Sequence, residues 1–194
     1  MTTKKIFITG GAGYIGSALV PLLLESGHEV TVYDNLTAGG DGILHNIVNP
    51  KFKFIKGDIL DKEHLAASIK GCDVVVHLAA IVGYTACRKN EELAKKVNHH
   101  GTKNVVSVLN GTQFLIYGST GSNYGAVKDV CTEETPLNPL SIYGRSKTLG
   151  EQEVLSYSNS TAFRFATAFG VSPRLRLDLL VNDLSFHAAS QKYV

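Results

Sequence analysis

A phenol and an ammonium group stand four residues apart in the stretch Tyr143-Gly-Arg-Ser-Lys147. If this stretch is helical, both side chains lie on one face, because residues four apart are neighbours on a helix. A tyrosine ordinarily has a pKa of about 10, which is too high for a base at neutral pH. A nearby ammonium favours the phenolate and lowers that pKa. The spacing therefore fits a tyrosine acid/base supported by a lysine, although two unrelated surface residues on a helix would give the same pattern.

Regularly spaced glycines form a second candidate site, in the stretch "ITGGAGYIGS". The pattern Gly10-x-x-Gly13-x-x-Gly16 follows an expected strand at Lys5–Thr9 and opens an expected helix at Tyr14–Ser26. This strand–turn–helix context is typical of a dinucleotide site. Gly10 would allow the tight turn, Gly13 would let the backbone approach a pyrophosphate, and Gly16 would let the helix pack on the strand. A glycine turn without a ligand is the alternative.

A dinucleotide site needs an acidic residue at the end of its second strand, where the carboxylate binds the adenosine ribose hydroxyls. Asp34 stands at this point, directly after the expected strand Glu29–Tyr33. Neither Asn35 nor Leu36 is a cation that could receive a 2′-phosphate. The sequence therefore favours NAD over NADP.

Asp58 and Ile59 follow the expected third strand, Phe52–Ile55. A residue at the carboxyl end of a strand in such a sheet faces the ligand crevice. Asp58 could therefore accept a hydrogen bond from the adenine amino group. The alternative is that it caps the next helix, a role that Asp61 could also fill.

Short β-branched runs alternate with longer amphipathic ones along the chain. Beyond the strands above, we expect further strands at Asp73–His77, Gln113–Tyr117 and Ala162–Phe165. We expect helices at Lys62–Ile69, at Glu91–Leu109 with an irregularity near Gly101, and within Pro139–Ser158, and a loop at Asn35–Asn49. The alternation predicts an α/β protein, a doubly wound Rossmann fold with a mostly parallel sheet and helices on both faces.

Composition excludes several classes of protein. The chain has 194 residues, of which 44% are hydrophobic and 19% charged, values that are ordinary for a globular protein. A formal net charge of +2 without a lysine or arginine run gives no nucleic-acid footprint. The 3 cysteines form no CxxC pair, so we expect reduced thiols and no metal site. No apolar run approaches the roughly 20 residues of a membrane span, and no signal peptide is recognisable. We therefore expect a cytoplasmic protein with no membrane or nucleic-acid partner.

In this order, the motifs resemble those of the extended short-chain dehydrogenase/reductase family, in particular its NAD-dependent nucleotide-sugar epimerases and dehydratases. The likeness includes "HLAA" at 77–80 and "NHHGTKNV" at 98–105, and it runs from about Lys4 to Ala189. Members of this family commonly dimerise through two helices, which correspond to about 91–109 and 141–158 here. The resemblance therefore implies a homodimer.

The resemblance also implies roles for individual residues. Tyr143 is the acid/base, Lys147 binds the nicotinamide ribose and tunes Tyr143, and Thr120 assists at the substrate hydroxyl. Asn98 braces the fold, and Asn182 touches the nucleotide diphosphate of the substrate. NAD is the implied cofactor, contacted by Gly10, Gly13, Tyr14, Ile15, Gly16, Asp34, Asn35, Asp58, Ile59, Leu78, Ala79, Ala80, Tyr143 and Lys147.

The stretch "YGSTGSNYG", residues 117–125, separates two branches of the family. Sugar-nucleotide 4,6-dehydratases resemble one another in carrying Thr-Asp-Glu here, the acid and base that remove water. This chain has Thr120 followed by Gly121 and Ser122, and neither of the last two supplies a carboxyl. Epimerisation needs only oxidation at one carbon, rotation of the keto sugar and hydride return to its other face. The resemblance thus favours a nucleotide-sugar 4-epimerase, with a UDP-sugar as its expected substrate.

The family normally continues well beyond the length of this chain. We therefore expect residues 1–170 to form an NAD-binding Rossmann domain, and 171–194 to begin a substrate-binding lobe that is largely missing. Arg174 and Arg176 either meet a phosphate or are solvated loop cations. The alternatives to an epimerase are a non-catalytic or truncated NAD-binding module, and a related NAD-dependent sugar-nucleotide reductase or dehydratase.

Overall fold

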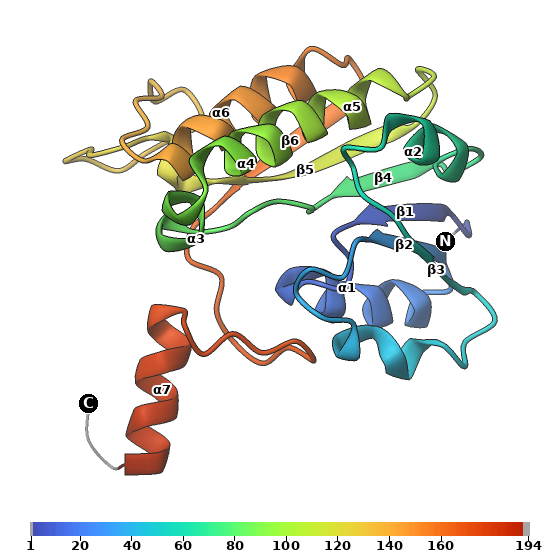
Figure 1. Ribbon diagram of the computed structural model, residues 1–194, viewed down its shortest axis with the longest axis horizontal. Helices are drawn as coiled ribbons and strands as arrows, with labels where there is room; N and C mark the ends of the chain where they lie inside the picture. Colours follow the sequence, from blue (N-terminus) through green and yellow to red (C-terminus); the bar gives the residue numbers. More distant parts are fainter. Residues whose placement is uncertain (1, 192–194) are drawn as a thin grey trace.

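Six strands form a parallel sheet in the computed structural model, which describes residues 2–191 (Figure 1). The strands are β1 (Lys5–Thr9), β2 (Glu29–Asp34), β3 (Phe52–Lys56), β4 (Val74–His77), β5 (Phe114–Thr120) and β6 (Ser160–Phe165). Their order across the sheet is β3-β2-β1-β4-β5-β6, and every neighbouring pair is parallel. The chain crosses from one edge to the middle between β3 and β4. This reversal opens a crevice between β1 and β4 at the carboxyl ends of the strands.

Helical segments cover both faces of the sheet. The helical segments of the described chain are α1 (Tyr14–Glu25), the 3₁₀-helix η1 (Asp41–Asn46), α2 (Lys62–Ser68), α3 (Tyr84–Lys89), α4 (Glu91–Lys95), the π-helix η2 (Lys96–Gly101), α5 (Thr102–Ser107), the 3₁₀-helix η3 (Gly121–Asn123), α6 (Ile142–Leu155) and α7 (Leu180–Gln191). Figure 1 shows α4, α5 and α6 together on one face and α1 on the other. The predicted doubly wound Rossmann fold is confirmed.

The two faces have separate cores because strand side chains alternate in direction. Ile6 and Ile8 of β1 pack with Val20 of α1 in one core. Phe7, between them in sequence, packs with Val105 of α5 in the other core. Burial on both faces explains why the strands read as continuous apolar runs instead of an alternating pattern.

Four helical segments were not expected from the sequence, one of them the short 3₁₀-helix η3. The segment predicted as a loop, Asn35–Asn49, contains η1, whose Ile43 is buried in the core beside α1. Helix α3 follows the loop after β4, and its Cys87 is fully buried. Helix α7 extends away from the sheet in Figure 1. Each of these segments is short or lacks a strong apolar periodicity, so local pattern did not mark it.

The long helix expected at Glu91–Leu109 is present as α4, η2 and α5 in succession, and it ends at Ser107. The irregularity expected near Gly101 is the π-helical turn η2. A Cβ at Gly101 would lie 2.5 Å from Cδ1 of Ile59, so glycine is needed where this turn approaches the loop after β3. π-Helical turns often occur at functional sites, and this one presses against the predicted cofactor loop.

Within residues 2–191, no helix is both long and apolar enough to cross a membrane. The same part of the chain contains no group of three or more side chains placed to hold a metal ion. Cys72, Cys87 and Cys131 are free thiols in the structure.

Candidate functional site

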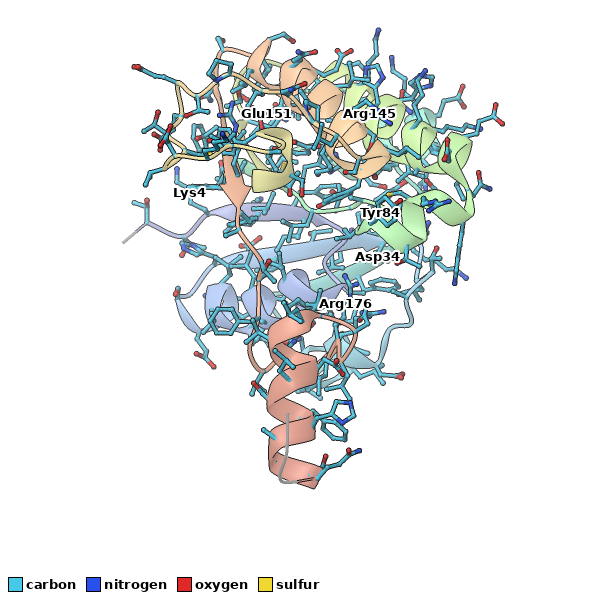
Figure 2. The ribbon with its side chains drawn as sticks, turned by 90° about the vertical axis from the view of Figure 1, so that its left-hand side faces the viewer. Lys4, Asp34, Tyr84, Arg145, Glu151 and Arg176 are labelled. Atoms are coloured by element: carbon cyan, nitrogen blue, oxygen red, sulfur yellow. The ribbon has the colours of Figure 1, made fainter. Side chains whose placement is uncertain are left out.

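A cavity of about 1200 Å³ opens at the carboxyl ends of the strands. Its wall contains all the residues predicted to contact the cofactor, together with Thr120. Figure 2 shows Asp34, Tyr84 and Arg176, which also belong to this wall, on one side of the molecule although they come from three separate segments. The parallel sheet brings these segments together because its strands all end at the same edge.

Gly10 makes the turn at the end of β1. Its φ is +72°, and a Cβ there would lie 2.5 Å from the backbone nitrogen of Ala79. Its N–H donates to the carbonyl of Tyr33 at 2.9 Å. Glycine tolerates both this φ and this approach. The turn therefore joins the ends of β1 and β2 to the segment after β4, at the centre of the crevice.

Gly13 stands immediately before α1, and the space that a side chain would occupy there is open. A Cβ there would have one neighbour within 4 Å, the carbonyl oxygen of Gly10 at 3.1 Å. No side chain among residues 2–191 caps the N-terminus of this 12-residue helix. The N–H groups of its first turn and the positive end of its dipole therefore face the cavity, the arrangement that binds a pyrophosphate.

Gly16 makes a different contact from the one expected. A Cβ there would lie 2.5 Å from the Cα of Gly11, so at this position α1 packs on the glycine turn and not on β1. A Cβ at Gly11 would in turn lie 2.7 Å from Cγ2 of Val32 in β2. The three-glycine pattern gave Gly11 no role, yet this residue lets the turn settle on the sheet.

Asp34 ties the glycine loop to the segment after β2. Its Oδ2 accepts from the N–H of Ala12 at 3.0 Å, and its Oδ1 accepts from the N–H of Leu36 at 2.8 Å. Burial raises the pKa of Asp34, while these two N–H groups and the charge of Arg174 oppose the rise. Each oxygen retains acceptor capacity for a ribose hydroxyl.

Asp58 does not cap the following helix. Asp61 does so, accepting from the N–H of His64 at 3.0 Å. The Oδ2 of Asp58 accepts from Nδ2 of Asn35 at 3.0 Å, and its Oδ1 accepts from the N–H of Leu60 at 2.9 Å. The carboxylate is thus held at the cavity wall. Its contact with the adenine amino group stays a prediction.

Two arginines from the segment after β6 reach the cavity wall as well. Nε of Arg174 donates to the carbonyl of Ala38 at 3.3 Å, near the loop that follows Asp34. Arg176 forms an ion pair with Asp178. No motif marks either arginine, since only folding brings this segment to the cavity. Neither Asn35 nor Leu36 is a cation, but Arg174 brings a positive charge to the loop that these residues begin.

Tyr143 lies in the first turn of α6, and its side chain lines the same cavity as Thr120. Burial raises the pKa of Tyr143 above its ordinary value; the Thr120 side chain opposes this rise, Cys87 adds to it, and Arg176 opposes it. We expected the charges of Lys147 and a positive nicotinamide together to lower this pKa; in the protein alone burial is the largest effect and raises it. The phenol is therefore protonated at neutral pH, and its ionisation needs a further positive charge in the cavity.

Lys147, one turn further along α6, is buried with 2% of its surface exposed. Its Nζ lies 3.9 Å from the ring centroid of Tyr117, a cation–π contact. Burial lowers the pKa of Lys147 to about 7, and the charge of Glu151 opposes this effect. No residue of the described chain hydrogen-bonds to Nζ, so its three N–H donors are available to ribose hydroxyls.

His77 connects the end of β1 to the start of α5. Its Nδ1 lies 2.6 Å from Oγ1 of Thr9, and its Nε2 lies 2.9 Å from Oγ1 of Thr102. The Thr102 hydroxyl donates to the carbonyl of Asn98 at 2.7 Å, so we assign the His77 proton to Nε2. The Asn98 side chain accepts from the N–H of Ile81 at 2.8 Å, a bracing contact of the expected kind.

Acid is expected to destabilise the protein through His77. Burial, with a smaller contribution from Lys147, lowers the pKa of His77 from 6.5 to about 3. The unfolded chain binds the extra proton between these values, so stability rises with pH from about 3 to 6.5. We expect His77→Gln to be less stable than the wild type at neutral pH. On acidification within that window, its free energy of unfolding should fall by about 1.4 kcal/mol less per pH unit than that of the wild type. Urea unfolding at several pH values measures both, and parallel curves would contradict the prediction.

Asn182 is the one predicted site residue that the structure places outside the cavity wall. Its Oδ1 accepts from the N–H of Gly170 at 2.8 Å. Its Nδ2 donates to the hydroxyl of Tyr14 and to the carbonyl of Arg176, both at 3.0 Å. Asn182 therefore holds the segment after β6 against α1, and its contact with a nucleotide diphosphate stays a prediction.

An open parallel sheet with a glycine cradle on one side of its crevice and a tyrosine–lysine pair on the other is the architecture of a dinucleotide-dependent dehydrogenase/reductase. Comparison with known proteins gives the same class in finer detail. The chain belongs to the NAD dependent epimerase/dehydratase family, whose family model matches residues 6–173. The resemblance read from the motifs is thereby confirmed, and NAD is the cofactor of this family.

Curated relatives of this chain include two that are described as 4-epimerases of UDP-glucose. The putative UDP-glucose 4-epimerase of Methanocaldococcus jannaschii is 34% identical over 166 residues, which cover 83% of this chain and 53% of that protein. The UDP-glucose 4-epimerase of Corynebacterium glutamicum is 34% identical over 179 residues, with 87% and 48% covered. The chain thus spans about half the length of these relatives.

Solved structures from both branches of the family share the fold. The UDP-glucuronic acid 4-epimerase of Bacillus cereus, in complex with UDP-glucuronic acid and NAD, has a TM-score of 0.85 and 30% identity, covering 95% of this chain and 63% of its own. The dTDP-glucose 4,6-dehydratase DesIV of Streptomyces venezuelae, with NAD bound, has a TM-score of 0.84 and 26% identity, with 96% and 62% covered. The fold alone therefore does not separate epimerase from dehydratase.

Proposed function

We propose that the chain acts as an NAD-dependent nucleotide-sugar 4-epimerase, which oxidises a UDP-sugar at C4 and reduces it on the opposite face. The observation that carries this proposal is that Thr120, Tyr143 and Lys147 line one cavity, with Tyr143 and Lys147 one turn apart on α6. These residues could remove the proton from one sugar hydroxyl and return it. Epimerisation needs no other acid or base from the protein. The 4-epimerases of UDP-glucose and UDP-arabinose among the relatives support the UDP-sugar as substrate.

The cavity wall fits NAD at both of its ends. Asp34 would accept from the adenosine ribose hydroxyls, and the first turn of α1 after Gly13 would donate to the pyrophosphate. Lys147 would donate to the nicotinamide ribose through its free N–H groups. The chemistry that bound NAD supplies is reversible hydride acceptance at the sugar carbon.

Proton transfer would fall to the two hydroxyl side chains. Tyr143 would take the proton from the C4 hydroxyl during oxidation and return it during reduction. Thr120, which lines the same cavity as Tyr143, would hold that sugar hydroxyl beside the phenol. The raised pKa of Tyr143 in the protein alone makes the phenolate depend on the positive charges that gather when the cavity is filled.

The dehydratase branch is the second candidate, because DesIV shares the fold. Loss of water requires a base beside the keto group and an acid for the leaving hydroxide. Gly121 has no side chain, and Ser122 brings only a hydroxyl to the cavity wall. These two residues therefore favour epimerisation over dehydration, whereas a related reductase would use the same Tyr143 and Thr120.

Incubation of the chain with NAD and UDP-galactose tests the proposal, with UDP-glucose detected by proton NMR. We expect the same mixture of the two sugars from either starting compound. UDP-arabinose and UDP-glucuronic acid, the substrates named for similar proteins, extend the assay. Binding of NAD without conversion of any of these sugars would favour a non-catalytic NAD-binding module, and formation of a deoxy-keto sugar would favour the dehydratase.

Three further expectations belong to the same proposal. We place the NAD-binding domain at residues 1–170 and the beginning of a substrate-binding region at 171–194. A homodimer through the helices at about 91–109 and 141–158 is proposed from family resemblance, and sedimentation of the chain at several concentrations tests it. A cytoplasmic location is proposed from composition.

A further inference from the structure

Glu151 is a buried acidic residue that the proposed mechanism does not use. It lies in α6 with 2% of its surface exposed. Its Oε2 accepts from the hydroxyl of Ser119 and from Nδ2 of Asn123, the latter at 2.9 Å. Figure 2 shows Glu151 in the upper part of the view, apart from Asp34 at the cofactor end of the cavity.

The second oxygen of Glu151 binds an arginine from the edge strand β6. Its Oε1 accepts from Nη2 of Arg164 at 2.6 Å and from Nε at 3.0 Å. Nη1 of Arg164 donates to the hydroxyl of Tyr124 and to the carbonyl of Glu133, each at 3.0 Å. Both carboxylate oxygens therefore accept at least two hydrogen bonds.

These partners place Glu151 between the two elements that carry the candidate catalytic residues. Tyr143, Lys147 and Glu151 follow one another at intervals of four along α6, so they share one face of the helix. Ser119 precedes Thr120 at the end of β5. Asn123 is the last residue of η3. Thr120 caps the start of this turn, because its hydroxyl accepts from the N–H of Ser122 at 3.1 Å.

We propose that Glu151 is a positioning residue of the candidate active site: it holds the strand end that carries Thr120 against α6, and it supplies the negative charge that faces Lys147 along that helix. The first role follows from the bonds to Ser119 and Asn123, which lie on either side of Thr120. Its effect on turnover rests on the proposed function, but its effect on Lys147 does not.

The charge of Glu151 matters because Lys147 is buried among groups that offer it little compensation. His77 of β4 faces it and is neutral, Tyr117 of β5 presents its ring, and Tyr143 of α6 is a protonated phenol. Burial lowers the pKa of Lys147 to about 7, and Glu151 is the group that opposes this effect. Without the Glu151 charge, Lys147 would lose its proton at a lower pH and donate less well to ribose hydroxyls.

NADH binding as a function of pH tests the proposal, using the fluorescence of NADH itself and no sugar. Glu151→Gln removes the charge and keeps the shape of the side chain, whereas Glu151→Asp keeps the charge. Glu153→Gln is the matched control, because Glu153 lies on the same helix but pairs with His99 on the outer side. We expect affinity to fall as pH rises through the Lys147 midpoint, and this midpoint to be lower in Glu151→Gln than in the wild type, Glu151→Asp or Glu153→Gln.

Each unit by which the midpoint falls weakens NADH binding tenfold at any pH above both midpoints. Coincident midpoints in Glu151→Gln and Glu153→Gln would overturn the proposal. If Glu151→Gln does not fold, the double variant Glu151→Gln/Arg164→Gln replaces it, since removing both charges of a buried pair is tolerated better than removing one.

In the sugar assay, displacement of Thr120 in Glu151→Gln should lower kcat by up to about 100-fold with the KM for the sugar retained. Failure of the sugar assay alone would count against the proposed function and leave the NADH result standing.

Discussion

Tyr143→Phe is expected to abolish turnover of the nucleotide sugar while NAD affinity stays within about twofold of the wild type. The phenol is the acid/base of the proposed reaction, and removal of such a group costs about 100-fold to 10,000-fold in rate. NAD affinity is retained because the proposed contacts of Asp34, Lys147 and the first turn of α1 are untouched. Initial rates with UDP-galactose and calorimetric titration with NAD measure the two effects separately.

Tyr157→Phe provides the matched control for this substitution. The Tyr157 hydroxyl donates to the carbonyl of Gln113 at 2.8 Å, outside the cavity wall. Its loss should reduce stability by about 1 kcal/mol and leave the rate unchanged. Activity above a tenth of the wild-type rate in Tyr143→Phe would remove this residue from the mechanism.

Gly13→Ala is expected to prevent NAD binding without disturbing the fold. The φ of Gly13 is −75°, which alanine adopts freely, and the new Cβ would meet one atom, the carbonyl oxygen of Gly10 at 3.1 Å, which has to shift only slightly. The methyl group would instead occupy the place where the pyrophosphate must approach α1. Loss of two hydrogen bonds to a charged phosphate weakens binding by about 100-fold or more. Calorimetric titration with NAD, together with the thermal unfolding midpoint, measures affinity and stability on the same sample.

Gly10→Ala gives the opposite combination and serves as the comparison. A Cβ at this position would lie 2.5 Å from the backbone nitrogen of Ala79, and the φ of +72° disfavours alanine. The substitution should therefore lower both the stability of the fold and the affinity for NAD. Unchanged NAD affinity in Gly13→Ala would mean that the glycine loop is a turn without a ligand.

Much of the candidate site could be predicted because its residues follow strands directly in sequence. Gly10 comes after β1, Asp34 ends β2, and Asp58 comes after β3. Parallel strands deliver all such positions to one edge of the sheet, so recognising the strands was enough to bring the residues together. The Tyr143–Lys147 pair was equally local, since four residues on a helix define one face.

The features that were missed or left open depend on approaches between distant segments. The sequence left Arg174 and Arg176 as either phosphate contacts or solvated loop cations, because no local pattern places the irregular segment after β6 beside Asp34. The pKa of Tyr143 was expected to fall through the charges of Lys147 and a positive nicotinamide together, whereas in the protein alone burial of the phenol, a property of the whole fold, raises it. Glu151 drew no attention because its partners come from β5, η3 and β6, and only their packing gives the carboxylate its role.

The central claim is that the chain oxidises a nucleotide sugar at C4 and returns the same hydrogen to the opposite face. The most direct measurement uses UDP-galactose carrying deuterium at C4, incubated with the chain and NAD in ordinary water. The hydrogen removed from C4 stays in the site and does not exchange with solvent, so we predict UDP-glucose that retains deuterium at C4 in its NMR spectrum. Absence of UDP-glucose, or UDP-glucose with solvent hydrogen at C4, would contradict the claim.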